Sequence, residues 1–186
     1  MSSHFKSISL AALLACTFTA NAQYCTPSAN CTDGDEIDNF VFNTISNLFS
    51  GGSNCNTTSY INTGLSTTVT KGVKYPIAIQ SGPAWPQGFG VWIDYNQDND
   101  FNDVSEFVYA SPTASTNWFN DSIIISSTAV TGSTRLRVRS QYNQTVTAGE
   151  SCSAFTWGET EDYTVIIQTN TLPPSADFTV VDTTFT

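Results

Sequence analysis

Hydrophobic residues alternate with polar ones in short runs along most of the chain, and two runs show this period of two most clearly. A period of two places the hydrophobic side chains on one face of a β-strand. No segment carries the period of a sustained helix. The alternating positions of the two runs are Val73, Tyr75, Ile77 and Ile79, and then Phe89, Val91, Ile93 and Tyr95.

Turn-forming residues separate about eight such β-rich runs. This arrangement predicts an all-β fold, an antiparallel β-sandwich of about eight strands that is Ig-like or jelly-roll-like. Roughly 145 residues are enough for one hydrophobic core and too few for two. The expected strands are residues 37–44, 58–62, 73–80, 89–95, 106–110, 121–126, 134–142 and 162–168.

Residues 94–106, called the acidic loop below, join two of the expected strands. Side-chain oxygens recur at alternate positions in Asp94, Asn96 and Asp98, and Asp100 stands where calcium loops of the EF-hand type use a backbone carbonyl. The rhythm predicts a Ca²⁺ site in this loop.

The acidic loop also departs from the EF-hand pattern. Asn99 replaces the glycine of the sharp turn, although Asn tolerates a left-handed backbone better than most residues. Ser105 occupies position twelve, so Glu106, one residue later, or Asp103 is expected to close the ligand shell. Strands rather than helices flank the loop. The alternative is a polar hairpin turn that binds no metal.

Residues 1–22 have the features of a signal peptide. Lys6 provides the basic start, residues 8–15 the apolar stretch and residues 20–22, Ala-Asn-Ala, the cleavage site. The apolar stretch is too short to span a bilayer. A second reading makes Cys16 a lipidated cysteine. We therefore expect a secreted protein, extracellular or on the outer cell surface.

Cleavage after Ala22 would change the charge balance. It removes His4, the only histidine, and Lys6, which leaves five basic and sixteen acidic residues and a net charge of −11. Such a surface repels nucleic acid and anionic lipid and suits divalent cations. Neither a nucleic-acid partner nor a membrane span is expected.

Four cysteines would remain in the mature chain: Cys25, Cys31, Cys55 and Cys152. An even number in a secreted chain predicts two disulfides, and three pairings are open. We favour Cys25 with Cys31 and Cys55 with Cys152, because the second bond would tie the early chain to the late chain. Irregular spacing and the lack of histidine argue against zinc.

Residues 157–165 read Trp-Gly-Glu-Thr-Glu-Asp-Tyr-Thr-Val. This segment resembles the signature of the GEVED domain, with Thr160 in place of Val, and residues 24–25, 34–37, 91–98 and 134–139 extend the resemblance. The resemblance implies a β-sandwich accessory module of a large secreted bacterial protein, beside peptidase, adhesive or Ig-like domains. The resemblance indicates the kind of protein in which such a module occurs rather than a specific biochemical activity.

The chain changes character after the last expected strand. The GEVED-like domain is expected to span residues 23–168, and residues 169–174, Thr-Asn-Thr-Leu-Pro-Pro, are expected to form an extended linker. Residues 175–186 resemble the start of a PKD-type Ig-like domain, so the native protein is expected to continue.

Three arginines alternate along one expected strand, and three acids begin another. Alternation places the arginines on one face, where we expect them to form structural ion pairs with the acids. The alternatives are a metal or ligand site built from the acids, or an acid–base catalytic pair. The residues are Arg135, Arg137, Arg139, Glu159, Glu161 and Asp162.

The chain holds four tryptophans: Trp85, Trp92, Trp118 and Trp157. Tryptophan side chains are most commonly buried in the core. Trp85 lies among prolines in an expected loop, so it is the best candidate for stacking on a ligand such as a sugar.

These observations favour a non-catalytic, calcium-stabilised module that serves adhesion, domain spacing or the holding of a glycan or a cell-surface or extracellular protein. The alternative is the N-terminal accessory region of a secreted hydrolase whose catalytic domain follows Thr186. A peptidase is the first candidate for that hydrolase. Without a mature histidine, neither a Ser–His–Asp triad nor a histidine zinc site can form. A glycosidase needs paired carboxylates in a cleft. The abundance of acidic residues is the only feature of the sequence that supports a glycosidase.

Overall fold

Short alternating segments form strands throughout the computed structural model, which describes residues 23–55 and 57–171. Within these residues there are nine strands and one 3₁₀ turn. Their bounds are β1 (Ile37–Phe42), β2 (Ile45–Leu48), β3 (Tyr60–Thr70), β4 (Lys74–Ser81), β5 (Gln87–Ile93), β6 (Phe107–Ala110), β7 (Phe119–Ile124), β8 (Gly132–Tyr142), η1 (Ala148–Glu150) and β9 (Thr160–Gln168).

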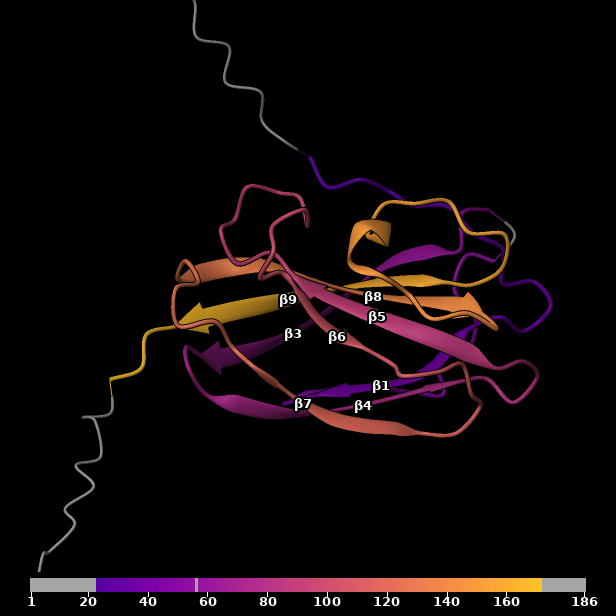
Figure 1. Cartoon of the computed structure of the whole chain (residues 1–186), viewed down its shortest axis with the longest axis horizontal. Coiled ribbons are helices and arrows are strands. Elements are labelled where there is room, and N and C mark those ends of the chain that lie inside the picture. Colours follow the sequence, from indigo (N-terminus) through magenta and orange to yellow (C-terminus); the bar gives the residue numbers. More distant parts are fainter. Residues whose placement is uncertain (1–22, 56, 172–186) are drawn as a thin grey trace, which may run out of the picture.

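The strands form two sheets that pack face to face. One sheet has the order β2-β1-β4-β7 and the other β3-β9-β8-β5-β6. In Figure 1 strands β1, β4 and β7 lie below β3, β9, β8 and β5. The predicted β-sandwich is confirmed. One pair of neighbours, β3 and β9, is parallel, so the larger sheet is mixed rather than purely antiparallel.

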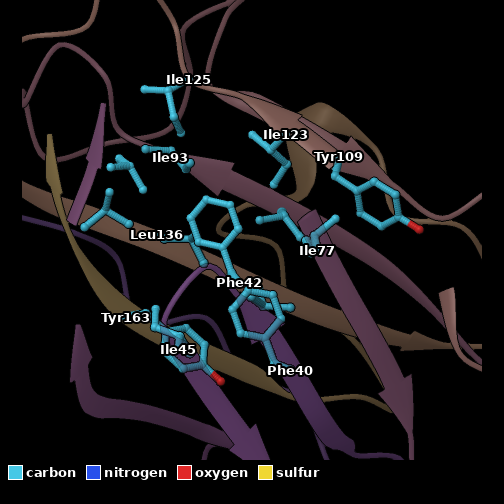
Figure 2. Close-up of a cluster of buried hydrophobic side chains, with 14 of the residues drawn as sticks. Phe40, Phe42, Ile45, Ile77, Ile93, Tyr109, Ile123, Ile125, Leu136 and Tyr163 are labelled. Atoms are coloured by element: carbon cyan, nitrogen blue, oxygen red, sulfur yellow. The ribbon is translucent and has the colours of Figure 1, made fainter. Parts of the chain in front are cut away.

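The hydrophobic core lies between the sheets. Ile77 and Ile79 of β4 and Phe89, Val91 and Ile93 of β5 are at most 2% exposed, which confirms the two faces predicted from alternation. Figure 2 shows side chains from both sheets gathered in this layer. Burying each large aliphatic or aromatic side chain contributes roughly 1.5–3 kcal/mol.

Two elements differ from the predicted strands. Strand β2 was not expected; it pairs with β1 after a turn in which Asn43 has a φ of 51°. Strand β3 was expected only over residues 58–62 but continues to Thr70. Its second half is rich in Thr, Ser and Gly, and its pairing with β9 forms this strand despite the weak hydrophobic pattern.

Two disulfides are present, as expected, but the favoured pairing is wrong. Cys25 is bonded to Cys152 and Cys31 to Cys55, with Cα separations of 5.9 and 4.8 Å.

The path of the N-terminal segment explains the actual pairing. The backbone carbonyl of Cys25 accepts a hydrogen bond from Arg137 Nη2 at 2.8 Å, which brings this cysteine over β8. The backbone N–H of Cys31 donates to Ser59 Oγ at 3.0 Å, which holds it beside the loop that carries Cys55. Such crossings are not visible in the spacing of cysteines.

No described segment forms a helix with the length and hydrophobicity that a bilayer span requires. The expected signal peptide, the lipidated Cys16 and the PKD-like segment 175–186 lie outside the described residues.

Candidate functional site

The acidic loop leaves the end of β5 and returns to the sheet as β6. Strand β5 lies between β8 and β6 in the sheet. Asp94 and Glu106, the first and last residues of the loop, are both buried.

Asp94 organises the first turn of the loop. Its Oδ1 accepts a hydrogen bond from the backbone N–H of Gln97 at 2.6 Å, and its Oδ2 accepts one from the N–H of Asn99 at 3.2 Å. The hydroxyl of Tyr24 also donates to Oδ2. Asn99 has a φ of 71°, so the left-handed backbone predicted for it is confirmed.

The middle of the loop gathers three carboxylates. Ligand oxygens of Asp98, Asp100 and Asp103 lie within 4.8 Å of one another. The side-chain amide of Asn96 donates to Asp98 Oδ2 at 2.9 Å and to Asp103 Oδ2 at 2.6 Å, which holds two of the three together. Oxygens at such separations can share one cation.

Glu106 closes the loop from the buried side. Its Oε1 accepts the backbone N–H of Tyr95 at 2.8 Å, whereas its Oε2 is buried and has no hydrogen-bond partner among the described residues. Glu106 lines a surface cavity of about 430 Å³ together with Asn96 and Asp103. Burial first, and then the charges of Asp94 and Asp103, raise the pKa of Glu106 to about 7.

Of the six residues expected to bind calcium, five fall into two groups, and the sixth, Asn96, links two members of the first through its side-chain amide. Asp98, Asp100 and Asp103 converge near the surface. Asp94 has both oxygens engaged by the loop itself. Glu106, with one oxygen unpartnered, lies outside the cluster and lines a cavity with Asp103.

The three arginines lie on one face of β8, and two of them contact one acid. Arg137 holds Asp162 with two hydrogen bonds, Nε to Oδ1 at 2.8 Å and Nη2 to Oδ2 at 2.9 Å. Arg135 Nη1 lies 3.1 Å from Asp162 Oδ2. Bidentate geometry of this kind fixes the position of β9 relative to β8.

Arg139 contacts none of the three acids. Its Nε donates to Thr160 Oγ1 at 3.0 Å, its Nη1 donates to the backbone carbonyl of Glu150, and its Nη2 is buried without a partner among the described residues. The guanidinium carbon lies 3.8 Å from the ring centre of Phe155. Burial first, and then the charge of Arg137, lower the pKa of Arg139 to about 9.

Glu159 and Glu161 bind partners away from the arginines. Glu159 accepts hydrogen bonds from the backbone N–H groups of Ile37 and Ser53. Glu161 accepts one from the hydroxyl of Tyr163. Burial first, and then the charge of Glu161, raise the pKa of Glu159, and burial raises the pKa of Glu161.

The register of β8 and β9 explains this division. Arg137 is paired with Asp162 and Arg139 with Thr160, whereas Glu161 is paired with Val138. Side chains of paired residues lie on the same face, so Asp162 and Thr160 meet the arginines and Glu161 points to the other face.

The tryptophans divide between interior and surface. Trp92 is buried, and its indole N–H donates to the backbone carbonyl of Ala148. Trp85 is 43% exposed and Trp118 is 42% exposed. Trp85 and Trp157 line a second surface cavity of about 430 Å³, which also includes Asp33, Asp35 and Tyr142. Sequence reasoning did not find this group, because its members come from four distant segments.

A family model for the GEVED domain matches residues 88–166. The matched segment runs from β5 into β9 and contains the acidic loop and the three arginines. The match supports the resemblance drawn from the sequence and indicates an accessory, non-catalytic type of module. A search of curated proteins finds no match.

Proposed function

We propose that this chain provides a non-catalytic accessory module whose acidic loop binds Ca²⁺, within a secreted multidomain bacterial protein. The GEVED match supports the accessory role. The buried Oε2 of Glu106, which has no partner among the described residues and belongs to a side chain facing the same cavity as Asp103, is the observation that carries the calcium site.

Electrostatics favours a cation in the acidic loop. Five carboxylates occur within residues 94–106. Two unit negative charges 4 Å apart repel each other by about 4 kcal/mol at the effective dielectric constant of a protein surface. A divalent cation between Asp98, Asp100 and Asp103 replaces this repulsion by attraction.

The donor set suits calcium. Every candidate ligand is an oxygen, and Ca²⁺ takes six to eight oxygens in flexible geometries, whereas softer metals prefer nitrogen or sulfur. In this proposal Asp98, Asp100 and Asp103 bind the ion directly. Glu106 completes the shell through its free oxygen, and Asp94 shapes the loop around them.

The ion would make the acidic loop rigid rather than perform chemistry. The only histidine of the chain, His4, lies outside the described residues, and the described cysteines are oxidised. In this proposal a calcium-ordered sandwich attaches or spaces other parts of the protein, whether those parts adhere to a surface or hydrolyse a substrate.

Thermal melting in calcium and in chelator tests the proposal. Free calcium at one hundred times the dissociation constant stabilises the folded state by about 2.7 kcal/mol, and extracellular modules bind with constants of ~0.1–1 mM. We expect calcium to raise the melting temperature of the wild type and to have little effect on a double variant, Asp98→Asn with Asp103→Asn. Asp121→Asn, an exposed acid on β7, is the matched control and should respond like the wild type.

Isothermal titration calorimetry completes the test. A heat of binding that disappears in the double variant and persists in the control supports a site in the acidic loop. If chelator leaves the wild-type melting temperature unchanged and calorimetry shows no heat, the loop is a polar turn and the proposal is wrong.

A further inference from the structure

The surface cavity lined by Asp33, Asp35, Trp85, Tyr142 and Trp157, called the aromatic–acidic cavity below, lies where several strand ends meet. Ile37, which begins β1, is paired with Ser81 at the end of β4, and Gln87, which begins β5, is paired with Tyr142 at the end of β8. The acidic loop follows the opposite end of β5. The two sites are therefore separate.

Two aromatic walls of the cavity are held in place by the protein. The indole N–H of Trp85 donates to the backbone carbonyl of Asp33 at 2.9 Å. The rings of Trp85 and Tyr142 meet nearly at right angles, 81°, with centres 5.8 Å apart. The backbone N–H of Asn143 donates to the carbonyl of Pro86 at 2.9 Å, which ties the two loops together.

The third aromatic wall depends on a glycine. The N–H of Tyr142 donates to the carbonyl of Trp157 at 3.3 Å, so the two residues are linked through the backbone. Gly158 follows with a φ of 144°, and a Cβ at this position would lie 2.1 Å from the carbonyl oxygen of Ser140. The close approach that positions Trp157 thus requires glycine.

The acidic side of the cavity lacks a cation. Asp35 is buried and accepts a hydrogen bond from Gln87 Nε2 at 2.9 Å. Burial first, together with the charge of Asp33, raises the pKa of Asp35. Within the described part of the chain the ion pairs all involve Asp162, so neither Asp33 nor Asp35 has a basic partner within 4 Å.

We propose that the aromatic–acidic cavity binds a ligand through an alkylammonium group, carried either by a lysine side chain or by an amino sugar. The face of an aromatic ring attracts cations, and Trp does so most strongly. A carboxylate beside the rings adds a charge-assisted hydrogen bond to the ammonium. The volume of about 430 Å³ also leaves room for the lysine stem or the sugar ring.

A neutral sugar fits these residues less well. It would stack on Trp85, the residue that the sequence singled out for stacking, but it would leave the mutual repulsion of Asp33 and Asp35 in place. An ammonium group would interact with both the aromatic rings and the carboxylates of the cavity. The net charge of −10 for the whole chain also favours the approach of cations.

Titration with two pairs of probes tests the proposal, at constant calcium so that the acidic loop does not change. One pair is glucosamine and its neutral analogue N-acetylglucosamine. The other pair is Nα-acetyl-lysine amide and Nα-acetyl-norleucine amide. We expect the ammonium probe of at least one pair to bind about tenfold more tightly than its neutral partner, and added salt to weaken this binding.

Substitutions locate the binding. Trp85→Ala and Asp33→Asn should each weaken ammonium binding about tenfold. Trp118→Ala removes a tryptophan of nearly equal exposure, 42% against 43%, that does not line the cavity, and Asp121→Asn removes an exposed acid elsewhere. Both controls should bind as the wild type does. Melting temperatures of all four variants show whether each one is folded.

The outcomes separate the sources and decide the proposal. Binding of glucosamine alone supports an amino sugar, binding of the lysine probe alone supports a protein side chain, and binding of both supports the shared chemistry. Equal binding of the neutral partners overturns the proposal in favour of neutral stacking. Absence of binding by every probe, or an equal loss in Trp118→Ala, also overturns it.

Discussion

Arg137 and Asp162 form a buried bidentate ion pair across β8 and β9, with hydrogen bonds of 2.8 and 2.9 Å. Arg137 also donates to the backbone carbonyls of Cys25 and Ser151, at 2.8 and 3.0 Å. One guanidinium therefore joins the central strands to the N-terminal segment and to the loop before β9.

Removal of this guanidinium should be costly. Arg137→Ala leaves the buried carboxylate of Asp162 with a hydrogen bond from the hydroxyl of Tyr60 at 2.8 Å and the longer contact to Arg135. The charge of Asp162 loses its bidentate partner, so we expect a loss of ~3 kcal/mol or more in the free energy of unfolding. Chemical denaturation measures it. Arg135→Ala is the control and should cost less, because Arg135 is partly exposed. Equal, small losses would show that the pair contributes little.

The stability of the calcium-free protein should fall as the pH rises from about 4.5 to about 7. Glu106 has a folded-state pKa of about 7, above its ordinary value of 4.5, so the folded state holds the extra proton in this window. Stability is greatest below the ordinary pKa and is lost as Glu106 ionises in the folded protein. Melting temperatures in chelator across this range measure the slope.

Glu106→Gln separates this effect from the raised pKa values of Asp35, Glu159 and Glu161, which act in the same direction. The variant should show a shallower slope than the wild type, and calcium should flatten the slope of the wild type alone. Identical slopes in both proteins would mean that Glu106 does not titrate as the structure indicates.

Tyr163→Phe should destabilise the protein by roughly 1–3 kcal/mol, because it removes a donor from the buried carboxylate of Glu161. The amide of Asn47, which donates to both residues, would lose one partner as well. Urea denaturation checks this. Tyr142→Phe removes a hydroxyl from a half-buried side chain that forms no hydrogen bond through it within the described residues, so this variant should stay within about 0.5 kcal/mol of the wild type.

The two disulfides should differ in their contribution to stability. The Cys25–Cys152 bond spans 127 residues and the Cys31–Cys55 bond spans 24. Loop-closure entropy predicts that removing the longer link, by paired Cys→Ser substitutions, costs about 1.5 kcal/mol more than removing the shorter one. Calorimetric melts of the two double variants give the comparison, and a larger loss for the shorter link would refute it.

Local patterns predicted much of the fold. The alternation at residues 73–79 and 89–95 identified the faces of β4 and β5 that meet the core between the sheets. It did not predict that the other face of β5, which carries Trp92, is buried as well. Asn99 was identified as a left-handed turn residue for an equally local reason. Strand β2 and most of β3 escaped prediction, since pairing with a neighbour rather than hydrophobic alternation holds them.

Site geometry was less accessible from the sequence. Alternation along β9 places Asp162 on the opposite face from Glu159 and Glu161. Only the register with β8 shows that the face of Asp162 is the one that carries the arginines. Cys25 and Cys152 meet because the N-terminal segment crosses β8, and Asp35 and Trp85 meet because their loops fold to the same end of the sandwich. Such contacts depend on tertiary structure.

The Cys25–Cys152 disulfide also determines how the chain responds to mechanical tension. A pulling force applied at residues 23 and 171 would pass along the covalent path through this bond. The residues between the two cysteines form a closed ring that cannot be drawn out while the bond is intact. Only the segments outside the ring can extend, by roughly 3.3–3.6 Å per residue. The C-terminal one includes β9, so tension would first pull on the pairing of β9 with β3 and β8. The acidic loop and the aromatic–acidic cavity except Trp157 lie within the ring, so the disulfide keeps tension along the chain from being carried through them.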